Sequence, residues 1–287
     1  MVEKKVRPLP RNRRELFFEV LRNHWFKIVL LSLSVSIFFI PFITAYMLKA
    51  VHVSSYMATI PEGITGNEAT SYLIQLLYIE MMWMAIILVT LIIGFIGLFI
   101  GMNYLKSLVF VDELTTFTQH FWKKFKDSLR DGIILGIVNG VVLFALKVAQ
   151  YLLVIYRIDT LGFVGIILSV VVYLVIFGID MYALSMNPFY KLTIGQLFKN
   201  SFLLYFARLL RNLVIELLAF GLLIFAMVFG QIFVSEIILM IYVGIMFGLG
   251  LLIITIANQT TLDEFINEQF APELLNNHIY PEGVDHE

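Results

Sequence analysis

The fold of this chain is decided by one apolar stretch, residues Leu76–Leu105, which read LLYIEMMWMAIILVTLIIGFIGLFIGMNYL. Glu80 is its only acidic residue, and it holds no lysine or arginine. An α-helix rises about 1.5 Å per residue, so about 20 apolar residues cross a hydrocarbon layer about 30 Å thick. The stretch is long enough to tilt within a bilayer or to project from it. It therefore predicts a membrane-spanning helix.

The composition of the whole chain favours the same class of protein. Hydrophobic residues make up 60% and charged residues 14% of 287 residues, and the mean hydropathy is +0.90. A typical soluble domain has about 25% charged residues. We expect an all-α, polytopic transmembrane bundle that forms one domain over residues 1–256, followed by an acidic cytoplasmic tail at 257–287. About six spans are predicted, at 26–48, 76–105, 133–156, 161–186, 213–233 and 237–256.

Lysine and arginine are unevenly divided between the two sides of these spans. Eight lie in or before the start of the first span, five in the loop after the second and four in the loop after the fourth. The other side has only Lys49 and Arg157, while Lys147 falls inside a span. Because cytoplasmic loops of membrane proteins are enriched in lysine and arginine, both termini are predicted to lie in the cytoplasm.

A helix-start pattern recurs where the chain returns to the predicted cytoplasmic side. A capping side chain is followed three residues later by Glu or Gln, as in a capping box. The pairs are Asn12–Glu15, Thr116–Gln119, Thr193–Gln196 and Thr261–Glu264. Apolar residues follow at helical spacing after the second and third pairs, which predicts amphipathic helices in the inner interface.

These interfacial helices allow two interpretations. They either dock a cytoplasmic partner or an anionic lipid, or they merely turn the chain at headgroup level. The candidate contacts for docking are Trp122 and the basic residues beside it, Lys123, Lys124 and Lys126. Trp122 could equally be an interface anchor, since tryptophan is enriched at membrane–water boundaries.

Two predicted intramembrane charges, Glu80 and Lys147, are candidates for pairing. Lys147 shares a helical face with Gly132, Gly136 and Gly140, and this small-residue spacing suits close helix packing. Glu80 lies near the outer end of the second span. We expect the two side chains to approach each other, because a counter-charge reduces the unfavourable free energy of a buried lysine. The alternative is that Lys147 extends to the outer interface.

A second candidate charge cluster is predicted in the inner halves of the fourth and fifth spans. Asp180 and Glu216 lie there, and Arg208 and Arg211 are near enough in sequence to neutralise them. Such carboxylates can serve a proton or cation pathway, or they can be paired structurally.

Several classes of chemistry are excluded by missing motifs. The chain has no cysteine, no G-x-x-x-x-G-K-[ST] phosphate loop, no H-E-x-x-H pair and no G-x-S-x-G elbow. The five histidines are scattered, so no metal site or cofactor is expected, and the chain is predicted not to be an enzyme. The basic residues border spans, which favours a lipid surface over nucleic acid as their partner.

Short motifs along residues 15 to 230 carry a family resemblance. Pro41 and Thr44 close an apolar helix that begins at Trp25-Phe26-Lys27, and Phe121-Trp122-Lys123-Lys124-Phe125-Lys126 forms an aromatic and basic loop. Pro188-Phe189 precedes Phe198-Lys199-Asn200-Ser201. In these features the chain resembles the YesL-like family of bacterial integral membrane proteins, which have no assigned activity. The resemblance implies a bacterial plasma membrane and an accessory role in carbohydrate uptake, with no catalytic residues.

Three functions follow as hypotheses. The first is a non-enzymatic accessory or scaffold protein whose partners are the bilayer and a membrane transporter or ATPase. The second is a transport-domain subunit that moves a small solute with an external energising partner, which requires a polar path through the spans. The third, a membrane-embedded enzyme, requires polar residues clustered at one depth. The sequence does not determine the oligomeric state.

Overall fold

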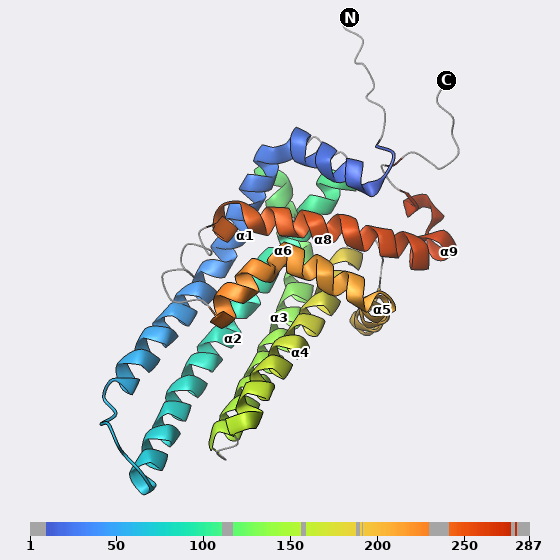
Figure 1. The fold of residues 1–287 in the computed structure, drawn as a ribbon. Coiled ribbons are helices and arrows are strands. Elements are labelled where there is room, and N and C mark those ends of the chain that lie inside the picture. Colours follow the sequence, from blue (N-terminus) through green and yellow to red (C-terminus); the bar gives the residue numbers. More distant parts are fainter. Residues whose placement is uncertain are drawn as a thin grey trace, which may run out of the picture. The chain divides into compact units, whose positions relative to one another are not determined.

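A computed structural model describes residues 10–110, 117–155, 159–187, 190, 192–229, 241–276 and 279. These residues form helices and no strands (Figure 1). The long helices are α1 (Arg13–Met57), α2 (Asn67–Phe110), α3 (Phe117–Ile155), α4 (Asp159–Met186), α5 (Ile194–Ala207), α6 (Leu209–Phe229) and α8 (Phe247–Leu262). Two π-helical turns, Tyr242–Met246 and Asp263–Asn267, flank α8, and α9 (Glu268–Phe270) and a 3₁₀ turn (Pro272–Leu274) follow.

Five described segments are long and apolar enough to cross a membrane. They are Arg13–Met57, Asn67–Phe110, Ser128–Ala149, Ile167–Met186 and Gly244–Phe270. The prediction of an all-α membrane protein is confirmed at this level. Parts of three predicted spans lie outside the described residues. They are residue 156 at the end of the third span, residues 230–233 at the end of the fifth and residues 237–240 at the start of the sixth.

Several predicted helix ends are wrong because the helices continue. Helix α1 continues past the predicted end of the first span at residue 48 to Met57, and it runs through Pro41 and Thr44, where the family resemblance implied a turn. Helix α3 is continuous from Phe117 to Ile155, so its amphipathic start is not a separate interfacial helix. Thr261 lies inside a helix rather than at a helix start. Of the other sequence motifs, Thr116 and Pro188-Phe189 lie outside the described residues.

The predicted acidic tail at 257–287 begins within a helix. Residues 257–270 continue the last long helix through a π-helical turn, and Asp263 and Asn267 are buried there. Residues 280–287 lie outside the described part of the chain.

The chain divides into two compact units. Unit 1 comprises residues 1–33, 101–124 and 178–287, and unit 2 comprises residues 34–100 and 125–177. Within unit 2, glycines bring helices close together. A Cβ on Gly97 of α2 would meet Phe38 of α1, and a Cβ on Gly136 of α3 would lie 2.6 Å from the Cα of Ile92 in α2. The predicted glycine face of α3 therefore packs against α2.

Within unit 1, α8 forms much of the core. Helix α6 packs along α8, and a Cβ on Gly250 would lie 3.1 Å from the carbonyl oxygen of Ala219. A Cβ on Gly248 would collide with the carbonyl oxygen of Ile28 in α1. Glycine at these positions lets the backbones approach closely, as at other membrane helix contacts.

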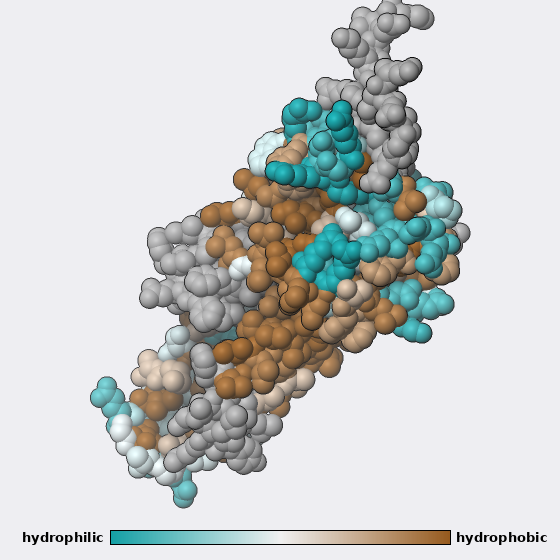
Figure 2. Space-filling view, turned by 45° about the vertical axis from the view of Figure 1, so that its right-hand side comes forward, coloured by the Kyte–Doolittle hydropathy of each residue, from teal (hydrophilic) through white to brown (hydrophobic). Residues whose placement is uncertain are grey.

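Large apolar side chains also face outward, as expected for helices in lipid. Figure 2 shows a face whose surface is hydrophobic over much of its area. The exposed apolar residues of α6 recur at helical spacing and form one stripe. They include Leu210, Val214, Leu217, Leu218 and Leu222. A soluble monomer rarely exposes such a stripe, so it supports a lipid-facing surface.

Candidate functional site

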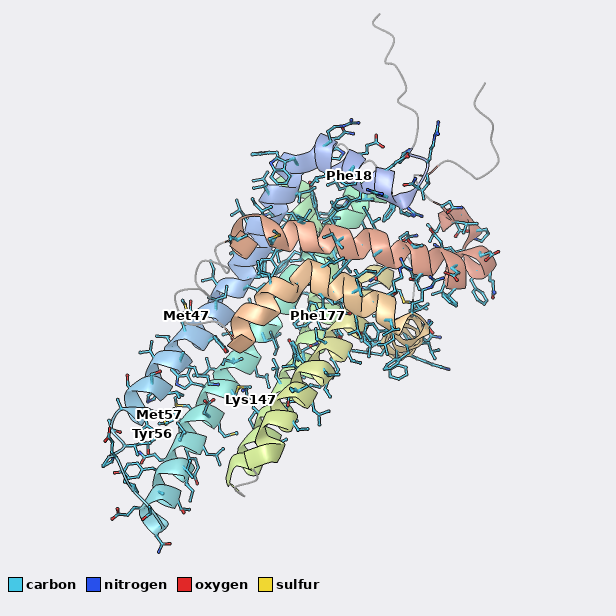
Figure 3. All side chains as sticks on the ribbon, viewed as in Figure 1. Phe18, Met47, Tyr56, Met57, Lys147 and Phe177 are labelled. Carbon is cyan, nitrogen blue, oxygen red and sulfur yellow. The ribbon has the colours of Figure 1, made fainter. Side chains whose placement is uncertain are left out.

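The first candidate site is a charge cluster in unit 2. Lys49 of α1 forms an ion pair with Glu80 of α2, and the two side chains are only 12% and 8% exposed. Lys147 of α3, marked in Figure 3, interacts electrostatically with both. The ion-pair partner of Glu80 is therefore Lys49, and the predicted partner Lys147 lies within electrostatic range of the pair.

Two aromatic side chains flank this charge cluster. Tyr46 lies three residues before Lys49 on α1, and its hydroxyl interacts electrostatically with Glu80. Trp83 of α2 donates a hydrogen bond from its Nε1 to Nδ1 of His52 in α1, at 3.0 Å. Because residues three apart share a helical face, Tyr46, Lys49 and His52 present one polar line along α1 toward α2.

The second candidate site is a buried polar network in unit 1. The hydroxyl of Tyr182 in α4 lies 3.0 Å from Oδ1 of Asn212 in α6 and 3.1 Å from Oγ1 of Thr261. Arg211 donates to Oγ1 of Thr261 at 3.2 Å and to the carbonyl oxygen of Ala257 at 3.0 Å. Three helices are thus tied together by side-chain hydrogen bonds, which satisfies polar groups that water cannot reach.

Glu216 of α6 lies beside this network. It is 3% exposed, and the hydroxyl of Tyr205 in α5 donates to its Oε2 at 3.4 Å. Gly178 of α4 has no room for a side chain, because a Cβ there would collide with Oε1 of Glu216 and the ring of Tyr205. Burial is the largest cause of the raised pKa of Tyr205, followed by the charge of Glu216. The break between α5 and α6 thus places the phenol of Tyr205 against the carboxylate of Glu216.

A small cavity adjoins Glu216. Its volume is about 10 Å³, and the polar side chains among those that line it are Tyr182, Asn212, Glu216 and Asn258. Asn258 of α8 donates through Nδ2 to the carbonyl oxygen of Met181 and to Oγ of Ser185. This volume is near the lower limit for one water molecule, so the cavity is too small for a sugar.

The predicted cluster of two acids and two arginines is only partly assembled. Glu216 and Asp180 are buried, at 3% and 0% exposure. Arg208, however, forms its ion pair with Glu264, and Arg211 makes the contacts to α8 given above. Arg208 therefore pairs with Glu264 and Arg211 bonds to α8, rather than to Glu216 as predicted.

The third candidate site is an open groove in unit 1 with a volume of about 450 Å³. We call it the α5–α9 groove, because α5 and the segment ending in α9 form most of its walls. Its lining residues are Met186, Tyr190, Leu192, Asn200, Leu203, Leu204, Ala207, Phe265, Ile266 and Phe270. Phe270 is 77% exposed, and Leu203 and Phe265 are also exposed. The groove is therefore apolar, accessible and rimmed by aromatic side chains.

Hydrogen bonds hold both walls of this groove in place. Thr193 caps α5, because its Oγ1 accepts from the backbone N–H of Gln196 while the Gln196 side chain accepts from the Thr193 backbone. The predicted capping box at this position is confirmed. Tyr190 donates to Oδ1 of Asn267, and burial, the largest cause, together with the charge of Asp263 raises the pKa of Tyr190.

The predicted docking residues of α3 lie on an accessible surface. Trp122 is 57% exposed and meets the buried Phe121 edge to face at 6.0 Å. Lys123 and Lys126 are exposed, and the side chain of Lys124 lies outside the described part of the chain. Trp122, Lys123 and Lys126 do not line the α5–α9 groove.

The comparisons with known proteins identify no family. The chain matches no protein-family model, no curated protein and no solved structure. Within the described residues, no group of three or more His, Asp or Glu side chains could hold a metal ion. The proposed function therefore rests on the fold and on local contacts.

Sequence reasoning missed Lys49 and the α5–α9 groove. Lys49 was assigned to an outer loop, although the apolar residues that follow it continue the helix to Met57. The groove depends on the break at Arg208, where φ is −135° and α5 ends directly before α6. No glycine or proline marks this break in the sequence, so the usual signal for a helix end was missing.

Proposed function

We propose that this chain is a non-enzymatic, multi-pass protein of a bacterial plasma membrane, and an accessory or scaffold component of a carbohydrate-uptake system. The observation that carries the proposal is the α5–α9 groove, with its exposed Phe270, Phe265 and Leu203. Aromatic and aliphatic side chains around a concave surface are typical anchors for a partner protein. The link to carbohydrate uptake comes from the resemblance to the YesL-like family.

The proposed occupant of the groove is an amphipathic helix of a transporter or ATPase subunit. Such a helix inserts apolar side chains at positions i, i+3 or i+4 and i+7 into an apolar groove. The rim carries charges that can orient it, because Arg208 and Glu264 form an exposed ion pair beside Phe265. A helix with both acidic and basic residues beside its apolar stripe would match this rim.

The docking test uses a photoactivatable crosslinker in the native host. The crosslinker replaces Leu203 or Phe270, and a matched control places it at Phe18, which is 55% exposed and outside the groove. We expect a transporter permease or ATPase crosslinked from both groove positions and not from the control. Phe270→Glu should abolish the crosslink from position 203 and reduce sugar uptake at an unchanged membrane level. Crosslinks to lipid alone, or equal capture from Phe18, would contradict the proposal.

The proposed topology has about six spans, both termini in the cytoplasm and α5 in the inner interface. The uneven distribution of lysine and arginine supports this orientation. The chain has no cysteine, so single cysteines introduced by mutation are unambiguous labels. A membrane-impermeant maleimide applied to intact cells should label Gly63→Cys in the turn after α1. It should not label Lys199→Cys in α5, and labelling of position 199 alone would reverse the proposed orientation.

A transport-domain subunit is the second candidate function, favoured by the buried carboxylate of Glu216 beside its cavity. Carboxylates inside membrane helices often mark proton or ion pathways. Purified protein in liposomes should then carry a solute flux that Glu216→Gln abolishes. Absence of flux with sugars, protons and monovalent cations, together with a positive docking test, would favour the accessory function.

A further inference from the structure

The carboxylate of Glu216 is buried without a counter-charge. The residue is 3% exposed, and within the described part of the chain it forms no ion pair, because Arg208 and Arg211 make their contacts elsewhere. The one hydrogen bond that reaches the carboxylate from a described residue is donated by Tyr205, at 3.4 Å. An ionised carboxylate removed from water is energetically unfavourable unless a positive charge or several donors compensate it.

The cavity beside this carboxylate has room for one small occupant. Its volume is about 10 Å³, close to that of a single water-sized sphere. Gly178 of α4 lines the same cavity, and a Cβ there would collide with Oε1 of Glu216. The missing side chain of Gly178 therefore leaves the room that the carboxylate takes at the cavity wall.

The other polar residues that line the cavity offer oxygen acceptors. Asn258 of α8 donates through Nδ2 to two oxygen atoms of α4, so the amide group it has left is Oδ1. Asn212 of α6 donates through Nδ2 to the carbonyl oxygen of Tyr205 at 2.8 Å, and its Oδ1 can accept a second contact besides that from Tyr182. The lining residues of α4, α6 and α8 thus carry a phenol oxygen, two amide oxygens and a carboxylate.

We infer that this cavity binds one small monovalent cation, Na⁺ among the common ions, with the carboxylate of Glu216 as its counter-charge. Carboxylate, amide and hydroxyl oxygens are the ligands that hard cations prefer. One carboxylate balances a single positive charge, whereas Ca²⁺ carries two and takes about six to eight oxygens. The small volume leaves no room for a hydration shell, so the ion contacts the protein oxygens directly.

This cation site is separate from the proposed docking surface. No residue that lines the cavity also lines the α5–α9 groove. A resident cation joins α4, α6 and α8 at equilibrium and requires no solute flux. Binding of Na⁺ is therefore measured independently of both the accessory and the transport function.

The first test is equilibrium binding of radioactive sodium to the purified full chain in detergent, with choline chloride holding the ionic strength constant. We expect one saturable site, for which unlabelled Na⁺ and Li⁺ compete more strongly than K⁺ because the cavity accepts only a water-sized sphere. Glu216→Gln keeps the size of the side chain and removes its charge, so it should weaken binding by about tenfold or more. The matched control is Glu264→Gln, which removes an exposed carboxylate of the same unit and should leave binding unchanged.

Thermal unfolding separates loss of the site from loss of the fold. A ligand that binds only the native state raises the unfolding midpoint by mass action. We expect Na⁺ to raise the midpoint of the unmodified chain and of Glu264→Gln, relative to choline. Glu216→Gln should unfold in choline at or above the midpoint of the unmodified chain, because it lacks the buried charge, and should not respond to Na⁺. A misfolded variant cannot give that result.

Three outcomes overturn the inference. The first is the absence of saturable Na⁺ binding by the folded, unmodified chain, which would leave the cavity to a water molecule beside a protonated carboxyl group. The second is undiminished Na⁺ binding by Glu216→Gln. The third is equal competition by Na⁺ and K⁺, which would contradict selection by the size of the cavity.

Discussion

The contact between α2 and α3 gives the sharpest quantitative prediction. In Gly136→Ala, the new Cβ would lie 2.6 Å from the Cα of Ile92, whereas ordinary van der Waals contact begins at 3.4 Å. Because the opposing atom belongs to the backbone, no side-chain rotation relieves the overlap. The helices must separate locally by roughly 0.8 Å, the difference between these two distances, and such a gap forfeits about a quarter to a half of each affected dispersion contact. Overpacking of this kind destabilises by about 1–3 kcal/mol.

The matched control is Gly221→Ala in α6. Among the side chains that the structure describes, a Cβ there would meet Leu217 of the same helix, at 3.6 Å, which is ordinary contact. Both substitutions gain the helix propensity of alanine over glycine, up to about 1 kcal/mol. The difference between the two variants therefore isolates the steric overlap and should be about 1–3 kcal/mol.

The assay is reversible unfolding of each variant in mixed micelles with increasing sodium dodecyl sulfate. Fluorescence of Trp25, Trp83 and Trp122 reports the transition. We expect Gly136→Ala to unfold at lower detergent fraction than Gly221→Ala, while Gly221→Ala equals or exceeds the unmodified chain. Equal stability of the two variants would refute the inference that α2 and α3 meet at backbone distance.

Three further predictions concern unit 1. Thr193→Ala removes the cap of α5 and should destabilise it by about 1 kcal/mol, seen as faster amide hydrogen exchange in α5 and unchanged exchange in α3. Asp263→Asn removes the carboxylate that forms an ion pair with the largely buried Arg13, so the free energy of unfolding should fall by on the order of 3 kcal/mol, and the double variant Arg13→Met with Asp263→Asn should recover part of that loss. Burial raises the pKa of Tyr190, so its neutral form stabilises the fold below the ordinary tyrosine pKa of about 10, and this contribution is lost as pH rises through the higher folded value. The alkaline ultraviolet titration of Tyr190→Phe should lack one late-titrating phenol, and an unchanged titration would contradict this.

The parts of the fold that depend on local pattern were predictable. Apolar length alone identified the membrane-spanning character of α1 to α4, because a helix that crosses hydrocarbon needs a fixed number of apolar residues. The capping box at Thr193 was readable because both partners are three residues apart in sequence. The glycine face of α3 was readable for the same reason, since residues 132, 136 and 140 repeat every four positions.

The parts that depend on neighbouring helices were not predictable. Helical spacing gives the face on which Glu80 lies, but it does not say which helix faces it, so the ion pair with Lys49 was not predictable. The Thr261–Glu264 pair has the residue types and the spacing of a capping box. Thr261 is nevertheless buried inside α8, where it is hydrogen-bonded to Tyr182. A tertiary hydrogen bond thus replaced the local one, which a sequence pattern cannot reveal.

The π-helical turn at Asp263–Asn267 sets the rotational phase of the helical residues that follow it, Glu268–Phe270. A π-helical turn accommodates one residue more than an α-helical turn, so side chains beyond it are rotated by about 100° from the positions that a regular helix would give them. In the observed phase Asn267 is buried and Phe270 is 77% exposed. The extra residue therefore rotates one wall of the α5–α9 groove outward. Deletion of a single residue within the π-helical turn would rotate Phe270 away from its exposed position.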